Sequence, residues 1–156
     1  MPADRIEREI DIDAPIDVVW TVITEPEHIN SWFTDSAELD LRPGGVGHFA
    51  WDVKGTSRQN VVNLRVERLE PPHFFSFRWD YPDGDDPTET NAPLVEFSLE
   101  AQGGSTRLRL VESGLEKIAR SEEDKETYLA EHTSGWTRIA ERLREYAPKQ
   151  QSVVAP

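Results

Sequence analysis

One strand-forming segment is followed at once by two helix-forming segments, and most of the remaining chain has strand patterns. Residues 5–13 alternate, with Ile6, Ile10 and Ile12 on one face and acidic residues opposite, while Arg8 interrupts the apolar face. Helices placed between a first strand and a later run of strands favour a curved antiparallel sheet that grips helices. Such a fold usually encloses a cavity, but this pattern alone names no ligand and no reaction.

The first helix is expected to begin near Pro15, because proline suits the first helical turn. The apolar residues from Val18 to Ile23 are too dense for a single stripe, so we expect this helix to be mostly buried. Thr24 and Glu27 have the spacing of a capping box, which predicts a second short helix that ends near Trp32.

The middle of the chain predicts an antiparallel sheet of about seven strands. Turn signals, including Pro43-Gly44-Gly45 and Gly103-Gly104, and the strand breaker Pro71-Pro72 separate the apolar segments. Six strands are expected at 5–13, 46–53, 58–69, 73–81, 94–101 and 106–111. Residues 82–91 carry four acids and no large apolar side chain, which indicates a solvated, mobile loop.

A long C-terminal helix is predicted over 124–146. Its apolar and amphipathic residues recur at steps of three and four, which forms one stripe for contact with the sheet. They are Tyr128, Leu129, His132, Trp136, Ile139, Ala140, Leu143 and Tyr146. We expect one domain over 1–147 and a disordered tail over 148–156.

The net charge of −13 disfavours nucleic acid and anionic membranes as partners, because both carry negative charge. There is no cysteine, so thiolate chemistry is excluded. No apolar run approaches the length of a membrane span, and the N-terminal residues have no signal-peptide pattern. We therefore expect a cytoplasmic protein that does not bind membranes.

Several motifs, in order along the chain, resemble the homologues of the activator of heat-shock protein 90 ATPase. They are Ala14-Pro15, Val19-Trp20, Thr24-Glu25-Pro26-Glu27-His28, Trp32, Asp40-Leu41-Arg42-Pro43-Gly44-Gly45, Phe75-x-Phe77-x-Trp79 and Gly103-Gly104-x-Thr106-x-Leu108-x-Leu110. This family belongs to the START-like (SRPBCC) group, which includes polyketide cyclases. The resemblance covers about 6–146 and implies an α+β helix-grip fold with a hydrophobic cavity between the sheet and the C-terminal helix.

An aromatic wall is the first candidate for a ligand site. Aromatic side chains suit the walls of a pocket, but the same residues could equally fill a solid core. The candidates, with one histidine, are Trp32, Phe49, Trp51, Phe77, Trp79, Phe97, His132 and Trp136. We expect the indole groups of Trp51, Trp79 and Trp136 to hydrogen-bond a ligand or water.

His132 lies on the apolar stripe between Leu129 and Trp136, where a solvent-facing histidine would not fall. It is either a satisfied core histidine or a ligand contact that could act as acid or base. Its orienting carboxylate would be Glu112 or Asp52, if the fold brings one of them near. No catalytic set is predicted.

Metal and cofactor sites are not predicted either. The remaining histidines, His28, His48 and His73, share no metal-ligand spacing. The acidic run at 83–86 has a misplaced glycine for a calcium loop, and Leu94 would stand at its twelfth position.

Three functions remain open at this point. The first is non-catalytic binding of a small hydrophobic or aromatic molecule in the cavity. The second is an enzyme of the polyketide cyclase or hydrolase type that uses the same cavity, with His132 as acid or base. The third is a co-chaperone-like module with a protein partner, which should display an exposed apolar patch.

Overall fold

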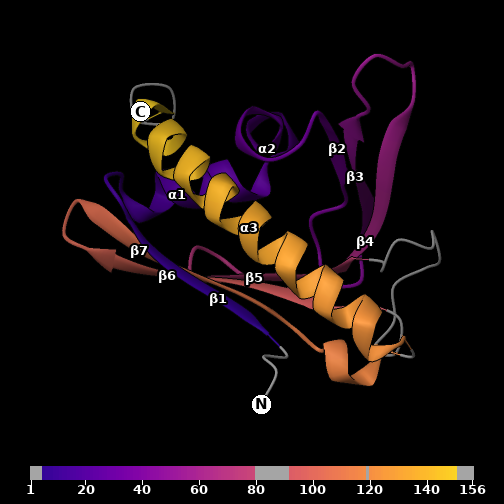
Figure 1. Ribbon diagram of the computed structural model, residues 1–156. Coiled ribbons are helices and arrows are strands. Elements are labelled where there is room, and N and C mark those ends of the chain that lie inside the picture. The colour runs from indigo at the N-terminus through magenta and orange to yellow at the C-terminus, as the bar shows by residue number, and fades with distance from the viewer. Residues whose placement is uncertain (1–4, 80–91, 119, 151–156) are drawn as a thin grey trace.

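The computed structural model describes residues 5–79, 92–118 and 120–150, and within them seven antiparallel strands form one sheet in the order β1-β7-β6-β5-β4-β3-β2. The strands are β1 (Ile6–Ile12), β2 (Ser36–Leu39), β3 (Val46–Asp52), β4 (Gln59–Glu70), β5 (Phe74–Trp79), β6 (Leu94–Gln102) and β7 (Ser105–Ser113). The helices are α1 (Ile16–Thr24), α2 (Pro26–Trp32) and α3 (Glu122–Tyr146), with 3-10 turns η1 (Leu115–Lys117) and η2 (Ala147–Gln150). The sheet curves around α3, and α1 and α2 lie beside the later turns of that helix (Figure 1). The predicted helix-grip fold is confirmed.

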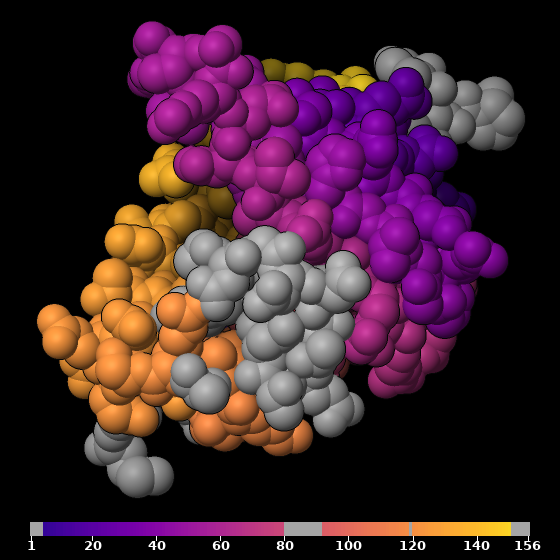
Figure 2. Space-filling view, turned by 90° about the vertical axis from the view of Figure 1, so that its right-hand side faces the viewer, coloured from indigo at the N-terminus to yellow at the C-terminus, as the bar shows by residue number. Residues whose placement is uncertain are grey.

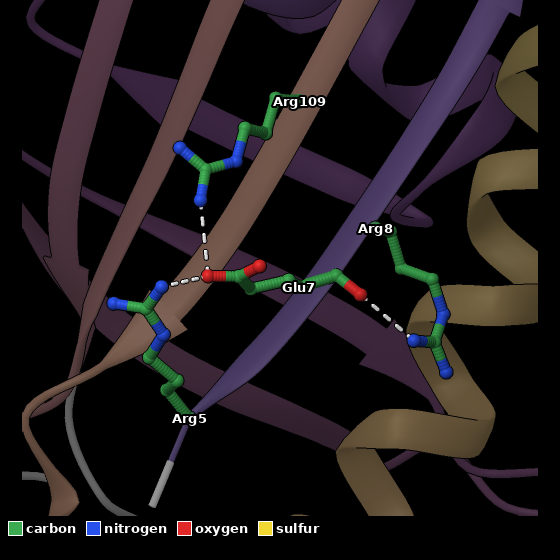
Figure 3. A network of polar contacts seen from close by, with 4 residues as sticks. All are labelled: Arg5, Glu7, Arg8 and Arg109. Carbon is green, nitrogen blue, oxygen red and sulfur yellow. Dashed lines mark hydrogen bonds and ion pairs between the residues drawn. The ribbon is translucent and has the colours of Figure 1, made fainter.

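Strand β1 shows how the alternating sequence is used. Ile6 and Ile12 are buried, whereas the Glu7 carboxylate lies on the outer face, where it accepts hydrogen bonds from Arg5 and, at 3.0 Å, from Arg109 of β7 (Figure 3). Arg8 points the other way, towards α3. Its Nε donates to Thr137 Oγ1 at 3.0 Å, so the break in the apolar pattern is a polar contact between strand and helix.

Helix α1 buries Val18, Val19, Val22 and Ile23, as their density predicts. The predicted capping box is wrong. The N-cap of α2 is Glu25 and makes no side-chain hydrogen bond, while Thr24 still belongs to α1. The Thr24 hydroxyl donates to the Trp20 carbonyl at 2.7 Å, so it is engaged in the last turn of α1 and does not cap the next helix.

The segment between α2 and β3 contains a strand that the sequence patterns did not predict. β2 has four residues and pairs only with β3 at the edge of the sheet. The turn that follows requires glycine, since a Cβ on Gly45 would lie 2.0 Å from the Asp40 carbonyl oxygen. This turn returns the chain into β3.

The two predicted mobile segments are only partly covered by the structure. The loop 82–91 lies outside the described residues. The tail expected from Pro148 begins instead with the 3-10 turn Ala147–Gln150, in which Ala147 is fully buried, and 151–156 lie outside the described residues. The strand predicted over 58–69 corresponds to β4, and its predicted end before Pro71 is confirmed.

Candidate functional site

A cavity of about 410 Å³ opens between α3 and the strands β3, β4 and β5. On the face drawn in Figure 2, the magenta residues of the β3–β4 hairpin and the orange residues of α3 border a recess, with later residues of α3 behind it. The cavity is lined by Phe33, Trp51, Val62, Trp79, Tyr128, Glu131, His132, Gly135, Trp136, Arg138 and Ile139. Its walls are therefore mainly aromatic, with two charged residues among them.

A second, larger hollow of about 840 Å³ lies over β2, β3 and β4. Its lining includes Glu38, His48, Asn63 and Arg65, and none of the described residues that line it is a phenylalanine, tyrosine or tryptophan. None of the candidate residues from the aromatic wall lies in it. The aromatic cavity is therefore the candidate site.

A buried carboxylate lies behind the wall of the aromatic cavity, where it contacts four of the lining residues. Glu112, near the end of β7, has no exposed surface and accepts four hydrogen bonds. Its Oε1 accepts from Trp136 Nε1 at 2.8 Å and contacts His132 Nδ1 at 2.9 Å. Its Oε2 accepts from Trp79 Nε1 at 2.8 Å and from the Tyr128 hydroxyl. Both oxygens are thus fully used by neighbours on β5 and α3.

Burial by itself raises the pKa of Glu112, because it disfavours the charged form. Hydrogen bonds from His132, Tyr128 and Trp136, together with the charge of His132 when protonated, act in the opposite direction and prevail. The pKa of Glu112 is lowered from its usual value of 4.5. Glu112 is therefore an ionised carboxylate at neutral pH.

The ionised carboxylate determines which ring nitrogen of His132 carries hydrogen. A carboxylate only accepts hydrogen bonds, so Nδ1 of His132 must be the donor, and the neutral ring keeps its lone pair on Nε2. The ring stacks on Tyr128 with 3.7 Å between centroids and meets Trp79 edge to face at 5.6 Å. These contacts fix the orientation of the imidazole.

The side chain of His132 is 28% exposed and lines the cavity, whereas Glu112 is sealed behind it. His132 thus presents part of its side chain to the cavity while its Nδ1 faces the sealed carboxylate. The cavity is therefore an aromatic compartment with one imidazole in its wall.

The structure brings four of the eight predicted site residues to the cavity, namely Trp51, Trp79, His132 and Trp136. The other four do not line it. Phe49, Phe77 and Phe97 are packed in the core with at most 2% exposure, and the Trp32 indole donates to the Val22 carbonyl at 3.0 Å.

The expectation that indole N–H groups would serve a ligand is wrong. Trp79 and Trp136 donate to Glu112, and Trp51 donates to the Phe33 carbonyl at 2.8 Å. A ligand can meet these three residues only through their ring faces and edges.

The predicted candidates omitted several residues that line the cavity, such as Phe33 and Gly135. Of the two carboxylates predicted as orienting partners of His132, the structure brings Glu112 to it, whereas Asp52 is exposed and accepts a hydrogen bond from Gln59.

Thr106, Leu108 and Leu110 alternate inward along β7, and Glu112 continues that series. The predicted strand ended at Val111, two residues before β7 ends at Ser113. Extending the alternation by one residue would have placed Glu112 in the interior.

One group of potential metal ligands is present in the described part of the chain. It consists of Glu25, Glu27 and His28, whose ligand atoms lie within 4.8 Å of one another at the start of α2. Nδ1 of His28 already hydrogen-bonds the Tyr146 hydroxyl at 2.8 Å, and both glutamates are exposed. The cluster is separate from the aromatic cavity.

The family model for "Activator of Hsp90 ATPase homolog 1-like protein" matches residues 13–147. The chain belongs to this family. The match covers both helices after β1, all strands from β2 onward and α3, so the resemblance of the motifs is confirmed. A comparison with curated proteins found no match. In the described residues, no helix combines the length and apolar character needed to cross a membrane.

Solved structures share this fold. CalU16 from Micromonospora echinospora is 26% identical, with 96% of this chain and 80% of that chain covered and a TM-score of 0.65. DynU16, from the dynemicin biosynthetic locus, is 23% identical with a TM-score of 0.69; the match covers 93% of this chain but only 47% of DynU16. The Aha1 dimer from Colwellia psychrerythraea is 17% identical, with 92% and 96% covered and a TM-score of 0.71. The last two, at these identities, support the fold alone.

Proposed function

We propose that this family member binds a small, largely aromatic or apolar molecule in the cavity between β3–β5 and α3. The observation that carries the proposal is the cavity itself. Its volume of about 410 Å³ falls within the range of small-molecule sites, and its walls are rings of Phe33, Trp51, Trp79 and Trp136. A flat ring can stack on these faces with little loss of hydrogen bonds, since the indole N–H groups are already paired.

Gly135 supports the same proposal. It lies inside α3, where glycine is unfavourable, and lines the cavity. A Cβ placed there would meet no atom within 4 Å, so the space beside the helix backbone is open. A side chain at this position would occupy the volume that a ligand needs.

Titration with a neutral apolar dye, N-phenylnaphthylamine, tests the proposal. We expect a saturable change in tryptophan fluorescence for the wild type and a much weaker one for Gly135→Leu, which fills the cavity from the helix side. The matched control is Ala130→Leu, because Ala130 lies on the exposed side of the same helix. A wild type without saturable binding, or equal binding by all three proteins, would remove the cavity as the site.

A catalytic role in the same cavity is the second candidate, and the contact between His132 and Glu112 favours it. A docking role has less support. In the described segments, the large apolar side chains that are exposed are Leu41, Val46 and Val61, and two of them belong to different strands. An interface would need a contiguous apolar patch.

A further inference from the structure

We propose that His132 is a general base in this cavity and that Glu112 is its positioning residue. The proposal rests on the proposed function, because the substrate must first enter the aromatic cavity. The substrate class is a small aromatic compound with an acidic C–H bond, such as the carbon next to a ring-conjugated carbonyl group. The reaction begins with removal of that proton.

The two side chains have different roles. Glu112 cannot touch a substrate, since it has no exposed surface and its oxygens are held by four neighbours. It can only act through His132. The contact of 2.9 Å fixes the tautomer with hydrogen on Nδ1 and leaves the lone pair of Nε2 for the cavity.

The Glu112 carboxylate also stabilises the positive charge that forms on His132. When Nε2 takes up a proton, the ring becomes a cation directly beside the Glu112 carboxylate. The carboxylate is held by two indole N–H groups and the Tyr128 hydroxyl, so it need not reorganise when the cation appears. An ionised partner in a fixed position is what a histidine base requires.

The proposed reaction balances in protons and electrons. The C–H bond of the substrate breaks, its proton passes to Nε2, and its electron pair moves into the conjugated carbonyl group to give an enolate. Return of the proton to another atom of the same molecule completes an isomerisation and regenerates the neutral imidazole. No oxidant, reductant or second substrate is needed.

In the described part of the chain, the other titratable and charged groups facing this site come from α3. They are Tyr128, Glu131 and Arg138, whereas β3, β4 and β5 contribute Trp51, Val62 and Trp79 to the lining. Arg138 provides a positive charge on the cavity wall for an enolate oxygen. Glu131 carries the opposite charge on the same helix, so the pH dependence must be assigned with variants.

Nitrobenzisoxazole is a suitable test substrate, because it is flat, aromatic and reports proton removal directly. A base takes the proton from its ring carbon, the C–H electron pair forms the nitrile, and the N–O bond breaks to release a coloured cyanonitrophenolate. The proton stays on His132 until it passes to solvent. Release of the phenolate is followed by absorbance, and binding is followed separately by tryptophan quenching.

We expect wild-type catalysis that rises with pH to a plateau. His132→Gln should lower kcat/KM by about 100-fold or more, because general-base catalysis contributes at least that much. Its side-chain amide still offers Glu112 an N–H donor, so quenching by the compound should persist. His48→Gln is the matched control, since His48 lies in the separate hollow over β2–β4. Glu112→Gln should also move the midpoint of the pH–rate profile to lower pH, which a purely structural role would not do.

The outcomes separate the two proposals. Binding without a rate above that of free imidazole, or equal rates for the wild type and His132→Gln, would overturn the general base and leave the binding function intact. An unchanged midpoint in Glu112→Gln would overturn the positioning role. Absence of quenching by both nitrobenzisoxazole and N-phenylnaphthylamine would overturn binding and catalysis together.

Discussion

Replacing Glu112 with glutamine should destabilise the protein markedly, although the two side chains have nearly the same shape. Four donors converge on the two carboxylate oxygens, two on each. The amide of glutamine offers one acceptor and one donor group in their place. The Tyr128 hydroxyl can turn to accept from the amide, or His132 can change tautomer to do so. An indole N–H cannot accept a hydrogen bond at all.

One tryptophan therefore loses its partner in either orientation of the amide, Trp79 in one and Trp136 in the other. An orphaned buried donor costs about 1–3 kcal/mol. The remaining bonds change from charge-assisted to neutral, which costs about 1 kcal/mol each, while removal of a buried charge offsets part of that loss. We expect Glu112→Gln to lower the free energy of unfolding by about 2–4 kcal/mol at neutral pH.

Urea denaturation of the wild type and Glu112→Gln, followed by tryptophan fluorescence, measures this difference. Glu38→Gln is the control, because the Glu38 side chain is 80% exposed. It should change the free energy of unfolding by less than about 0.5 kcal/mol. A loss below about 1 kcal/mol in Glu112→Gln would show that the four contacts do not hold the carboxylate as described.

Three further predictions concern stability and the cavity. Trp136→Ala should lower the free energy of unfolding by about 3–5 kcal/mol, because its ring is 2% exposed in the core; a loss below about 1 kcal/mol in chemical denaturation would contradict this. The folded-state pKa of Glu112 lies below its usual value of 4.5, so the stability that Glu112 contributes is present above pH 4.5 and is lost as the pH falls below it. The stability difference between wild type and Glu112→Gln should shrink there, and a constant difference would refute the assignment. Gly135→Ala should raise the free energy of unfolding by about 1 kcal/mol, since helix propensity improves and no atom lies within 4 Å of the new Cβ. The same variant should bind the dye more weakly than the wild type. Equal binding would show that the cavity wall at Gly135 is not used.

The architecture was largely predictable because periodicity reports which face of a segment is buried. The stripe from Tyr128 to Tyr146 predicted α3, and the alternation of Phe75, Phe77 and Trp79 predicted the inward face of β5. Strand β2 escaped prediction because four residues at a sheet edge are too few to show alternation. The boundary between α1 and α2 was misplaced because a threonine hydroxyl can either cap the next helix or bond a carbonyl one turn back, and the hydroxyl of Thr24 does the latter.

The site was less predictable because it depends on contacts between distant residues. Spacing placed His132 and Trp136 on one helix face, but it could not show that Glu112 of β7 meets both of them. Aromatic content likewise could not separate Trp51, which lines the cavity, from Phe49, which is sealed in the core two residues earlier. Both residues lie on the same face of β3, so the distinction depends on what packs over each of them and not on the alternation.

Imidazole nitrogen chemical shifts of His132, measured by NMR with and without N-phenylnaphthylamine, test the central claim most directly. They report at once which nitrogen carries hydrogen and whether the other nitrogen meets a ligand in the cavity. At a pH where the ring is neutral, we predict hydrogen on Nδ1 and none on Nε2 in the free protein, with a change at Nε2 on addition of the dye and none at His48. A neutral ring with its hydrogen on Nε2, or His132 shifts that do not respond to saturating dye, would contradict the account.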